Sequence, residues 1–105
     1  MKRLISFLLV LVVSTTLFGI LNAKQISIGY VLVGPHNDGG WSMRHHQGFQ
    51  SLTKHGYKVS MVEMVPESDS KKVFSKLARK HDIVFATSFG YMDPMVKAAK
   101  KNKDT

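Results

Sequence analysis

The stretch GPHNDGGWS, at residues 34–42, decides how the rest of the chain is organised. It follows the apolar run ISIGYVLV at residues 26–33, which is typical of a buried strand, and it precedes residues 43–55, which can form a helix. A glycine-rich polar loop between a strand and a helix is where α/β proteins commonly contact a ligand. We therefore predict that this loop forms one wall of a small-molecule cleft. The alternative is an ordinary turn in which Asp38 caps the helix and Trp41 enters the core.

Apolar residues alternate between strand-like and helix-like spacing from residue 26 onward. Strands are predicted at residues 26–33, 57–65 and 82–87, and a first helix at residues 41–55, ended by Gly56. A second helix is predicted to begin at Ser68 or Asp69, and a third at Asp93 and Pro94. The predicted buried faces of these helices carry, in order, Trp41, His45, Phe49 and Leu52; Val73, Phe74, Leu77 and Ala78; and Met95, Val96, Ala98 and Ala99.

Three strand–helix units in succession predict an α/β fold, a Rossmann-like parallel sheet with helices on both faces. Right-handed crossovers and the usual doubly wound order place the second strand on one side of the first and the third strand on its other side. The loops at residues 34–42 and 88–93 then lie next to each other at the carboxyl edge of the sheet. This convergence favours the cleft over the ordinary turn.

Residues 1–23 have the organisation of a secretory signal peptide, which we exclude from the fold. Lys2 and Arg3 precede an apolar run at residues 4–13, and Ala23 offers a cleavage position. An uncleaved anchor is the alternative, because residues 4–21 approach the roughly 20 residues that span a bilayer. In both cases the remaining chain is predicted to be extracytoplasmic: periplasmic after cleavage, and membrane-associated without it.

The composition excludes several classes of function. The chain has 105 residues and no Cys, so disulfides, thiol nucleophiles, Cys-based metal sites and lipid-modified cysteines are ruled out. The formal net charge is +8, but the basic residues fall mostly on predicted helices without interleaved aromatic residues. We therefore expect solvated helix faces and no nucleic-acid partner. Three parallel strands are few for an independent sheet, so the sequence is expected to be a fragment or a truncated product.

No catalytic or cofactor motif is found. The sequence lacks GxGxxG, a Walker-type loop and GxSxG. A metal site built from His36 and Asp38 is less favoured than a polar turn, and the adjacent His45 and His46 diverge on a helix. We therefore expect a binding protein with no enzyme activity, no cofactor and no metal. The candidate ligand-binding residues are Asn37, Asp38, Trp41, Ser42, Ser88, Phe89, Gly90 and Tyr91.

These residue types indicate the chemistry of the ligand. Aromatic faces from Trp41, Phe89 and Tyr91, together with a carboxylate and hydroxyl groups, suit a nucleoside or a sugar. The alternative for Phe89 is packing beneath the loop. Asp93 is expected to serve mainly as a helix cap.

Residues 34–42, with IGYV at 28–31, VEMVPE at 62–67 and TSFGYMDP at 87–94, closely resemble the basic membrane protein family. These proteins are the purine nucleoside receptor-like, solute-binding components of ABC transporters. The resemblance covers residues 25–105. It implies that residues 24–105 form part of the N-terminal lobe of a type I periplasmic-binding-protein fold, in which two lobes close on a ligand.

The resemblance also implies a function. The expected ligand is a purine nucleoside or nucleobase, passed on to a membrane permease, with Asp38 and Trp41 in the ligand-contacting loop and residues 88–91 at the same cleft. Many members have Phe and Asn where this chain has Trp41 and Ser42. Two other functions remain open at this stage: an extracytoplasmic sensor or partner-binding module, and a non-functional truncation.

Overall fold

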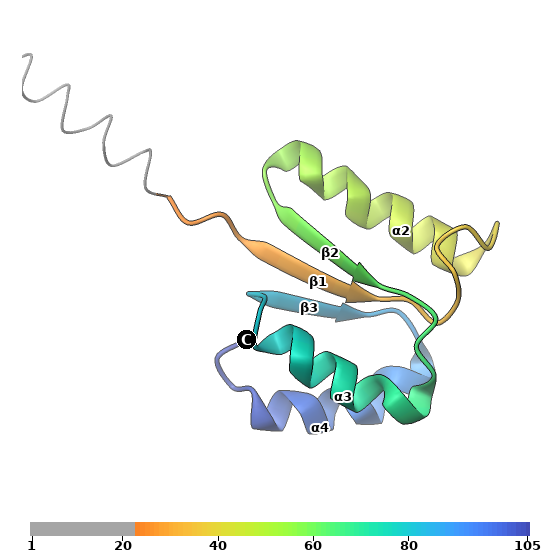
Figure 1. Ribbon diagram of the computed structural model, residues 1–105, viewed down its shortest axis with the longest axis vertical. Helices are drawn as coiled ribbons and strands as arrows, with labels where there is room; N and C mark the ends of the chain where they lie inside the picture. Colours follow the sequence, from red (N-terminus) through yellow and green to blue (C-terminus); the bar gives the residue numbers. More distant parts are fainter. Residues whose placement is uncertain (1–22) are drawn as a thin grey trace, which may run out of the picture.

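The computed structural model describes residues 23–105, so the predicted signal peptide lies almost entirely outside the described residues. A parallel sheet of three strands forms the centre of this region, in the order β2-β1-β3 (Figure 1). The strands are β1 (Ser27–Val31), β2 (Lys58–Val62) and β3 (Ile83–Ala86). This is the predicted fold class and strand order. The strands are shorter than predicted because the apolar runs continue into the loops at the carboxyl edge.

Helices cover both faces of the sheet. α2 (Trp41–Ser51) lies on one face and continues into a short 3₁₀ turn, η1 (Leu52–His55). α3 (Glu67–Ala78) and α4 (Met92–Lys101) pack side by side on the other, with a second 3₁₀ turn, η2 (Phe89–Tyr91), before α4. Gly56 ends the first helical segment as predicted, with a φ of 86° that favours glycine. Among the described residues, no helix is long and apolar enough to cross a bilayer.

Two predicted helix starts are wrong. α3 begins at Glu67, after Pro66, and neither Ser68 nor Asp69 caps it. α4 begins at Met92, because η2 already turns the chain into a helical path, and no side chain caps it. Asp93 therefore lies inside the first turn of α4. There its negative charge faces the positive end of the helix dipole, which still stabilises the helix start.

The main core lies between the sheet and the α3–α4 layer. Its buried residues are Val31, Val65, Phe74, Leu77, Tyr91 and Ala98. Phe74 and Leu77 confirm the predicted buried face of α3. The corresponding prediction for α4 is only partly right, since Ala98 is buried but Val96 and Ala99 are exposed.

On the opposite face, the fully buried Tyr30 stacks on Phe49 of α2 with ring centroids 4.3 Å apart. The amino end of β3 is tied to β1 by Asp82, whose carboxylate accepts hydrogen bonds from the backbone N–H of Ser27 at 2.8 Å and from its hydroxyl at 2.9 Å. Asp82 also pairs with Lys24 at 2.7 Å. The bond to Lys24, followed by those to Ser27, lowers the pKa of Asp82. These contacts tie the amino ends of β1 and β3 to each other.

Candidate functional site

The loop after β1 is organised by the carboxylate of Asp38. It accepts hydrogen bonds from three backbone N–H groups at the start of α2: Gly40 at 2.8 Å, Ser42 at 3.1 Å and Met43 at 3.0 Å. The bonds from Met43 and Gly40 are the main reason that the pKa of Asp38 is lowered. The predicted capping by Asp38 is therefore confirmed. The bonds also keep an ionised carboxylate at the carboxyl edge of the sheet.

Trp41 joins this loop to the loop after β3. Its indole Nε1–H donates to the carbonyl oxygen of Thr87 at 2.6 Å, and its ring packs against His45 with centroids 4.6 Å apart. Thr87 is itself fixed, because its hydroxyl donates to the carbonyl oxygen of Val31 at 2.8 Å. The Trp41 side chain nevertheless remains 57% exposed. The ordinary-turn alternative required Trp41 to be a core residue, and its exposure excludes this. A face of its ring is open to solvent.

A second contact holds the same loop to the end of β2. Glu63 accepts a hydrogen bond from the backbone N–H of His36 at 2.6 Å and pairs with the His36 imidazole at 2.8 Å. The backbone N–H of His36, followed by its side chain, lowers the pKa of Glu63. His36 therefore positions the loop, and its contacts in this structure are those of a polar turn. Among residues 23–105, no cluster of three or more His, Asp or Glu side chains could hold a metal ion.

The two aromatic residues of the loop after β3 lie in different environments, one in solvent and one in the core. Phe89 is 85% exposed, so it does not pack beneath the loop. Tyr91 is fully buried; its hydroxyl donates to the carbonyl oxygen of Val65 at 2.5 Å, and its ring lies edge-on to Phe74. Burial raises the pKa of Tyr91. The prediction that Tyr91 offers an aromatic face to the ligand is therefore wrong, because its ring fills the core and anchors the loop.

The two loops enclose a hollow of about 570 Å³ at the carboxyl edge of the sheet. Six of the eight predicted ligand-binding residues line it: Asp38, Trp41, Ser42, Ser88, Phe89 and Gly90. Asn37 is exposed but is not among the lining residues, and neither is the buried Tyr91. Val33, Gly34 and Glu67 also line the hollow and were not predicted. The sequence offered a signal for Glu67 only in its position just after the second strand.

Two of these residues, Ser42 and Gly90, also have a structural role in the loops. Ser42 is only 1% exposed and its hydroxyl accepts from the backbone N–H of Gly34 at 3.2 Å, so it stabilises the loop from within. Gly90 leaves room for the Glu67 carboxylate, since a Cβ at this position would lie 1.5 Å from Glu67 Oε1. The polar side chains open to the hollow are thus Asp38, Glu67 and Ser88, beside the rings of Trp41 and Phe89.

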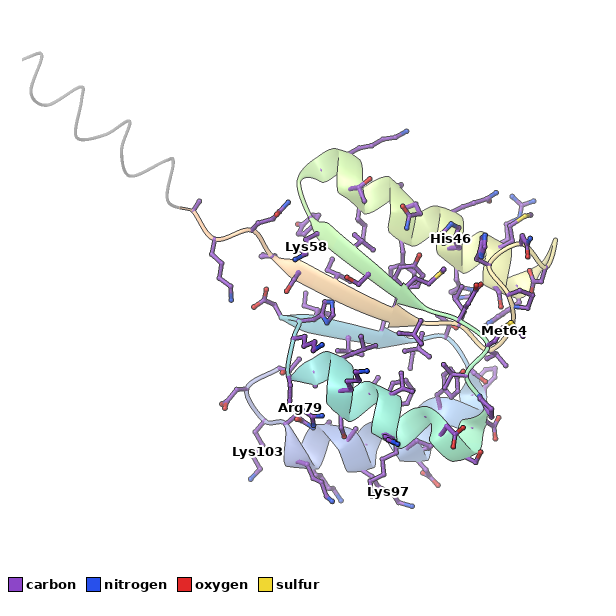
Figure 2. The ribbon with its side chains drawn as sticks, in the orientation of Figure 1. His46, Lys58, Met64, Arg79, Lys97 and Lys103 are labelled. Carbon is purple, nitrogen blue, oxygen red and sulfur yellow. The ribbon has the colours of Figure 1, made fainter. Side chains whose placement is uncertain are left out.

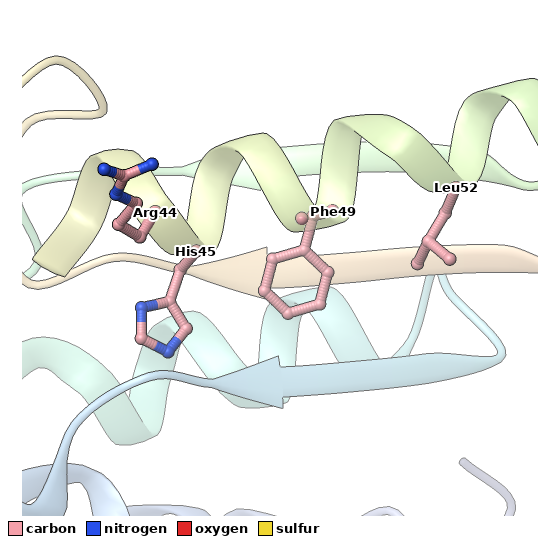
Figure 3. Close-up of a pocket in the computed structure, with 5 residues that line it drawn as sticks. Arg44, His45, Phe49 and Leu52 are labelled. Carbon is pink, nitrogen blue, oxygen red and sulfur yellow. The ribbon is translucent and has the colours of Figure 1, made fainter.

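A separate groove runs along α2 and the start of η1 (Figure 3). Its volume is about 380 Å³, and Arg44, His45, Gly48, Phe49 and Leu52 line it. The predicted face of the first helix is therefore only half-buried. Ile83 and Phe85 of β3 are more than two-fifths exposed, at 41% and 43%. This side of the sheet is incompletely covered, and its apolar lining offers few groups that could orient a ligand.

Comparison with known proteins gives two relatives by sequence. A purine-binding protein of Brucella abortus is 38% identical over 86 residues, 77% of this chain and 25% of that protein. A Haloferax volcanii protein, whose name assigns it to glucose binding in an ABC transporter, is 33% identical over 85 residues, 78% of this chain and 22% of that protein. The chain thus spans about a quarter of the length of these relatives. No protein-family model matches it.

The fold matches a solved structure. An ABC transporter solute-binding protein from Conexibacter woesei superimposes with a TM-score of 0.71 at 18% sequence identity, over 76% of this chain and 27% of that one. This match confirms the Rossmann-like α/β lobe. The resemblance inferred from the sequence is thus supported, because the chain is similar in sequence and in fold to parts of proteins named for solute binding, two of them in ABC transporters.

Proposed function

We propose that this chain, a relative of ABC transporter solute-binding proteins, forms one wall of the ligand cleft in an extracytoplasmic receptor of the basic membrane protein type. In this proposal residues 1–23 are a signal peptide and residues 24–105 belong to an N-terminal lobe. The ligand is a purine nucleoside, and a membrane permease receives it. The relative from Brucella abortus, named as a purine-binding protein, supports this choice of ligand.

The observation that carries the proposal is the pair of exposed aromatic rings at the hollow. Trp41 and Phe89 come from different loops, line the same hollow, and are 57% and 85% exposed. Large aromatic side chains are usually buried when they have no partner to bind. Because the N–H of Trp41 is already bound to Thr87, its ring is held in place and a face of it remains for stacking on a planar base.

The polar groups of the hollow restrict the class of ligand further. Asp38 and Glu67 are carboxylates, and ionised carboxylates only accept hydrogen bonds. No Lys or Arg is among the residues that line the hollow. The ligand should therefore present hydrogen-bond donors, such as ribose hydroxyls or an exocyclic amino group, and should carry no negative charge. These requirements favour a nucleoside over a nucleotide.

A single wall should bind weakly. Stacking of one base on an aromatic side chain contributes about 1–3 kcal/mol, whereas a dissociation constant of 1 mM requires about 4.1 kcal/mol. We therefore expect a half-saturation point on the order of 1 mM or weaker for this chain alone. In the proposed receptor, a second lobe covers the other side of the ligand and supplies the remaining affinity.

Tryptophan fluorescence tests the proposal directly, because Trp41 is the only Trp in the chain. We expect adenosine and inosine to quench the fluorescence of the purified chain saturably, and AMP to quench it far less. N-acetyl-tryptophanamide, titrated in parallel, corrects for collisional quenching. Asp38→Asn, which retains a polar side chain, should weaken the saturable component.

The same titration with glucose and ribose examines a sugar ligand, because an aromatic ring beside carboxylates also suits a sugar. The name of the Haloferax volcanii relative gives a reason to include glucose. A saturable response to glucose and none to adenosine would replace the nucleoside proposal by a sugar-binding one. If every compound quenched Trp41 and N-acetyl-tryptophanamide equally, the hollow would not be a binding site for either class.

A further inference from the structure

The positive charge of the chain is concentrated in one layer of the fold. Beyond the predicted leader there are 13 Lys and Arg residues, and nine of them lie between residues 71 and 103. These nine residues, here called the basic face, are Lys71, Lys72, Lys76, Arg79, Lys80, Lys97, Lys100, Lys101 and Lys103. The whole stretch from the start of α3 to residue 105 contains five acidic residues, Glu67, Asp69, Asp82, Asp93 and Asp104. Asp82 is already engaged by Lys24 and Ser27, so it neutralises little of this charge.

All nine side chains are exposed. Within residues 23–105 the close contacts between basic and acidic side chains are Lys24–Asp82 and His36–Glu63, so no member of the basic face is in contact with a carboxylate. A helical layer that is merely solvated usually intersperses charges of both signs. Here the nine basic residues outnumber the four acidic ones that remain besides Asp82, and this excess of positive charge costs repulsion unless an anionic partner is nearby.

The geometry places these charges on the outer side of the α3–α4 layer. On α3, Lys72, Lys76 and Arg79 follow one another at spacings of four and three residues, which puts them on one side of the helix. Phe74 and Leu77 occupy the buried side. Figure 2 shows Lys97 and Lys103 extending from this layer away from the sheet. Because α3 and α4 pack side by side, the basic residues of both helices belong to one layer.

We propose that the basic face binds a bilayer containing anionic phospholipids and holds the protein at the membrane surface. An exposed apolar residue of α4, Val96 (53%), is next to Lys97 in the sequence and can enter the headgroup region. A membrane fits better than a nucleic acid, because ABC solute-binding proteins act beside a membrane permease and the basic face carries no aromatic side chain for base stacking.

This contact is compatible with ligand binding. The hollow lies at the carboxyl ends of the strands, whereas Lys97 and Lys103 of the basic face extend from the α3–α4 layer away from the sheet (Figure 2). A membrane beneath the helical layer would therefore leave the hollow open at the edge of the sheet. The inference goes beyond the proposed function and does not depend on which ligand the hollow takes.

Vesicle cosedimentation of the purified chain tests the proposal. Vesicles of phosphatidylglycerol mixed with phosphatidylcholine are compared with vesicles of phosphatidylcholine alone. We expect binding to the anionic vesicles that falls steeply as NaCl is raised from about 0.05 to about 0.5 M, because the Debye length shortens over that range. The triple variant Lys72→Gln, Lys76→Gln, Lys97→Gln should bind at least about tenfold more weakly.

A matched triple variant shows whether vesicle binding depends on the basic face, on the net charge of the chain or on the leader. Arg44→Gln, Lys54→Gln, Lys58→Gln removes the same charge from the rest of the fold and keeps residues 1–23 unchanged. The affinity of this variant for the anionic vesicles should fall by less than about threefold. Equal losses in the two triple variants, or no preference of the unaltered chain for anionic vesicles, would overturn the proposal.

Two further experiments test whether charge is what the vesicles recognise and whether a nucleic acid binds more tightly. The variant Lys72→Arg, Lys76→Arg, Lys97→Arg retains the charge and should bind the vesicles as the unaltered chain does. If it fails to bind although its thermal transition is unchanged, charge is not what the vesicles recognise and the proposal fails. A double-stranded oligonucleotide that binds the basic face more tightly than the anionic vesicles do would replace the membrane by a nucleic acid.

Discussion

Replacing Tyr91 by Phe separates a core role from a ligand-binding role. The Tyr91 hydroxyl donates to the carbonyl oxygen of Val65 at 2.5 Å, and the two residues are 0% and 5% exposed. Removing the hydroxyl keeps the ring and its packing on Phe74 but leaves a buried carbonyl without its donor. Leaving one such group unsatisfied costs about 1–3 kcal/mol of the free energy of unfolding. In a domain of this size, the melting temperature falls by about 4–8 °C for each kcal/mol.

Urea denaturation of the purified chain, followed by circular dichroism, measures the change. Tyr57→Phe is the matched control, because Tyr57 is only half-buried and its hydroxyl forms no hydrogen bond within residues 23–105; it should change the free energy of unfolding by less than about 0.5 kcal/mol. The fluorescence response to adenosine should be unchanged in Tyr91→Phe under conditions where the variant is folded. Unchanged stability combined with lost adenosine binding would show that Tyr91 contacts the ligand and does not anchor the core.

Three further predictions concern the exposed ring, the loop carboxylates and the glycines. Phe89→Ala should alter the free energy of unfolding by less than about 0.5 kcal/mol, since the side chain is 85% exposed, yet reduce the adenosine-induced quenching severalfold; unaltered quenching would exclude this ring from the site. Thermal melts from pH 6 to pH 3 should show stability that is present above about pH 4.5 and lost below it, and a flat profile would contradict the hydrogen bonds assigned to the carboxylates. These carboxylates, whose pKa values are lowered by folding, are Asp38, Glu63 and Asp82. In denaturant titrations, Gly56→Ala should lower the free energy of unfolding by about 1–2 kcal/mol, because the φ of Gly56 is 86°. Gly48→Ala should raise it by about 0.5–1 kcal/mol, because Gly48 lies inside α2 with open space around it. Changes of the same sign in the two variants would contradict these backbone roles.

The order of the strands and the meeting of the two loops could be predicted from the sequence. Three strand–helix units leave few arrangements once crossovers are right-handed, and the observed order β2-β1-β3 is the one that these rules favour. The capping role of Asp38 was also predictable, since an acidic residue just before a helix has N–H groups within reach. These features depend on local chemistry and on general rules of chain topology.

The roles of individual side chains in the second loop could not be predicted. Phe89 and Tyr91 are two residues apart and equally aromatic, yet one is 85% exposed and the other is fully buried. The difference arises from η2, a single 3₁₀ turn that directs Tyr91 toward Val65, and no sequence periodicity marks so short a turn. Glu67 was missed for a related reason: it reaches the hollow only because α3 begins at that residue, earlier than its capping signals indicated.

The contacts within the two loops determine how the proposed wall would contribute to binding. Asp38 holds the start of α2 through three backbone N–H groups, Trp41 is fixed to the carbonyl of Thr87, and Glu63 holds His36. These bonds join residues of the lobe itself, so folding orders the loops that bear the exposed ring of Trp41. A preordered wall loses little conformational entropy when a ligand stacks on it. In the proposed receptor, the affinity should therefore depend mainly on how closely a second lobe covers the exposed faces of the ligand.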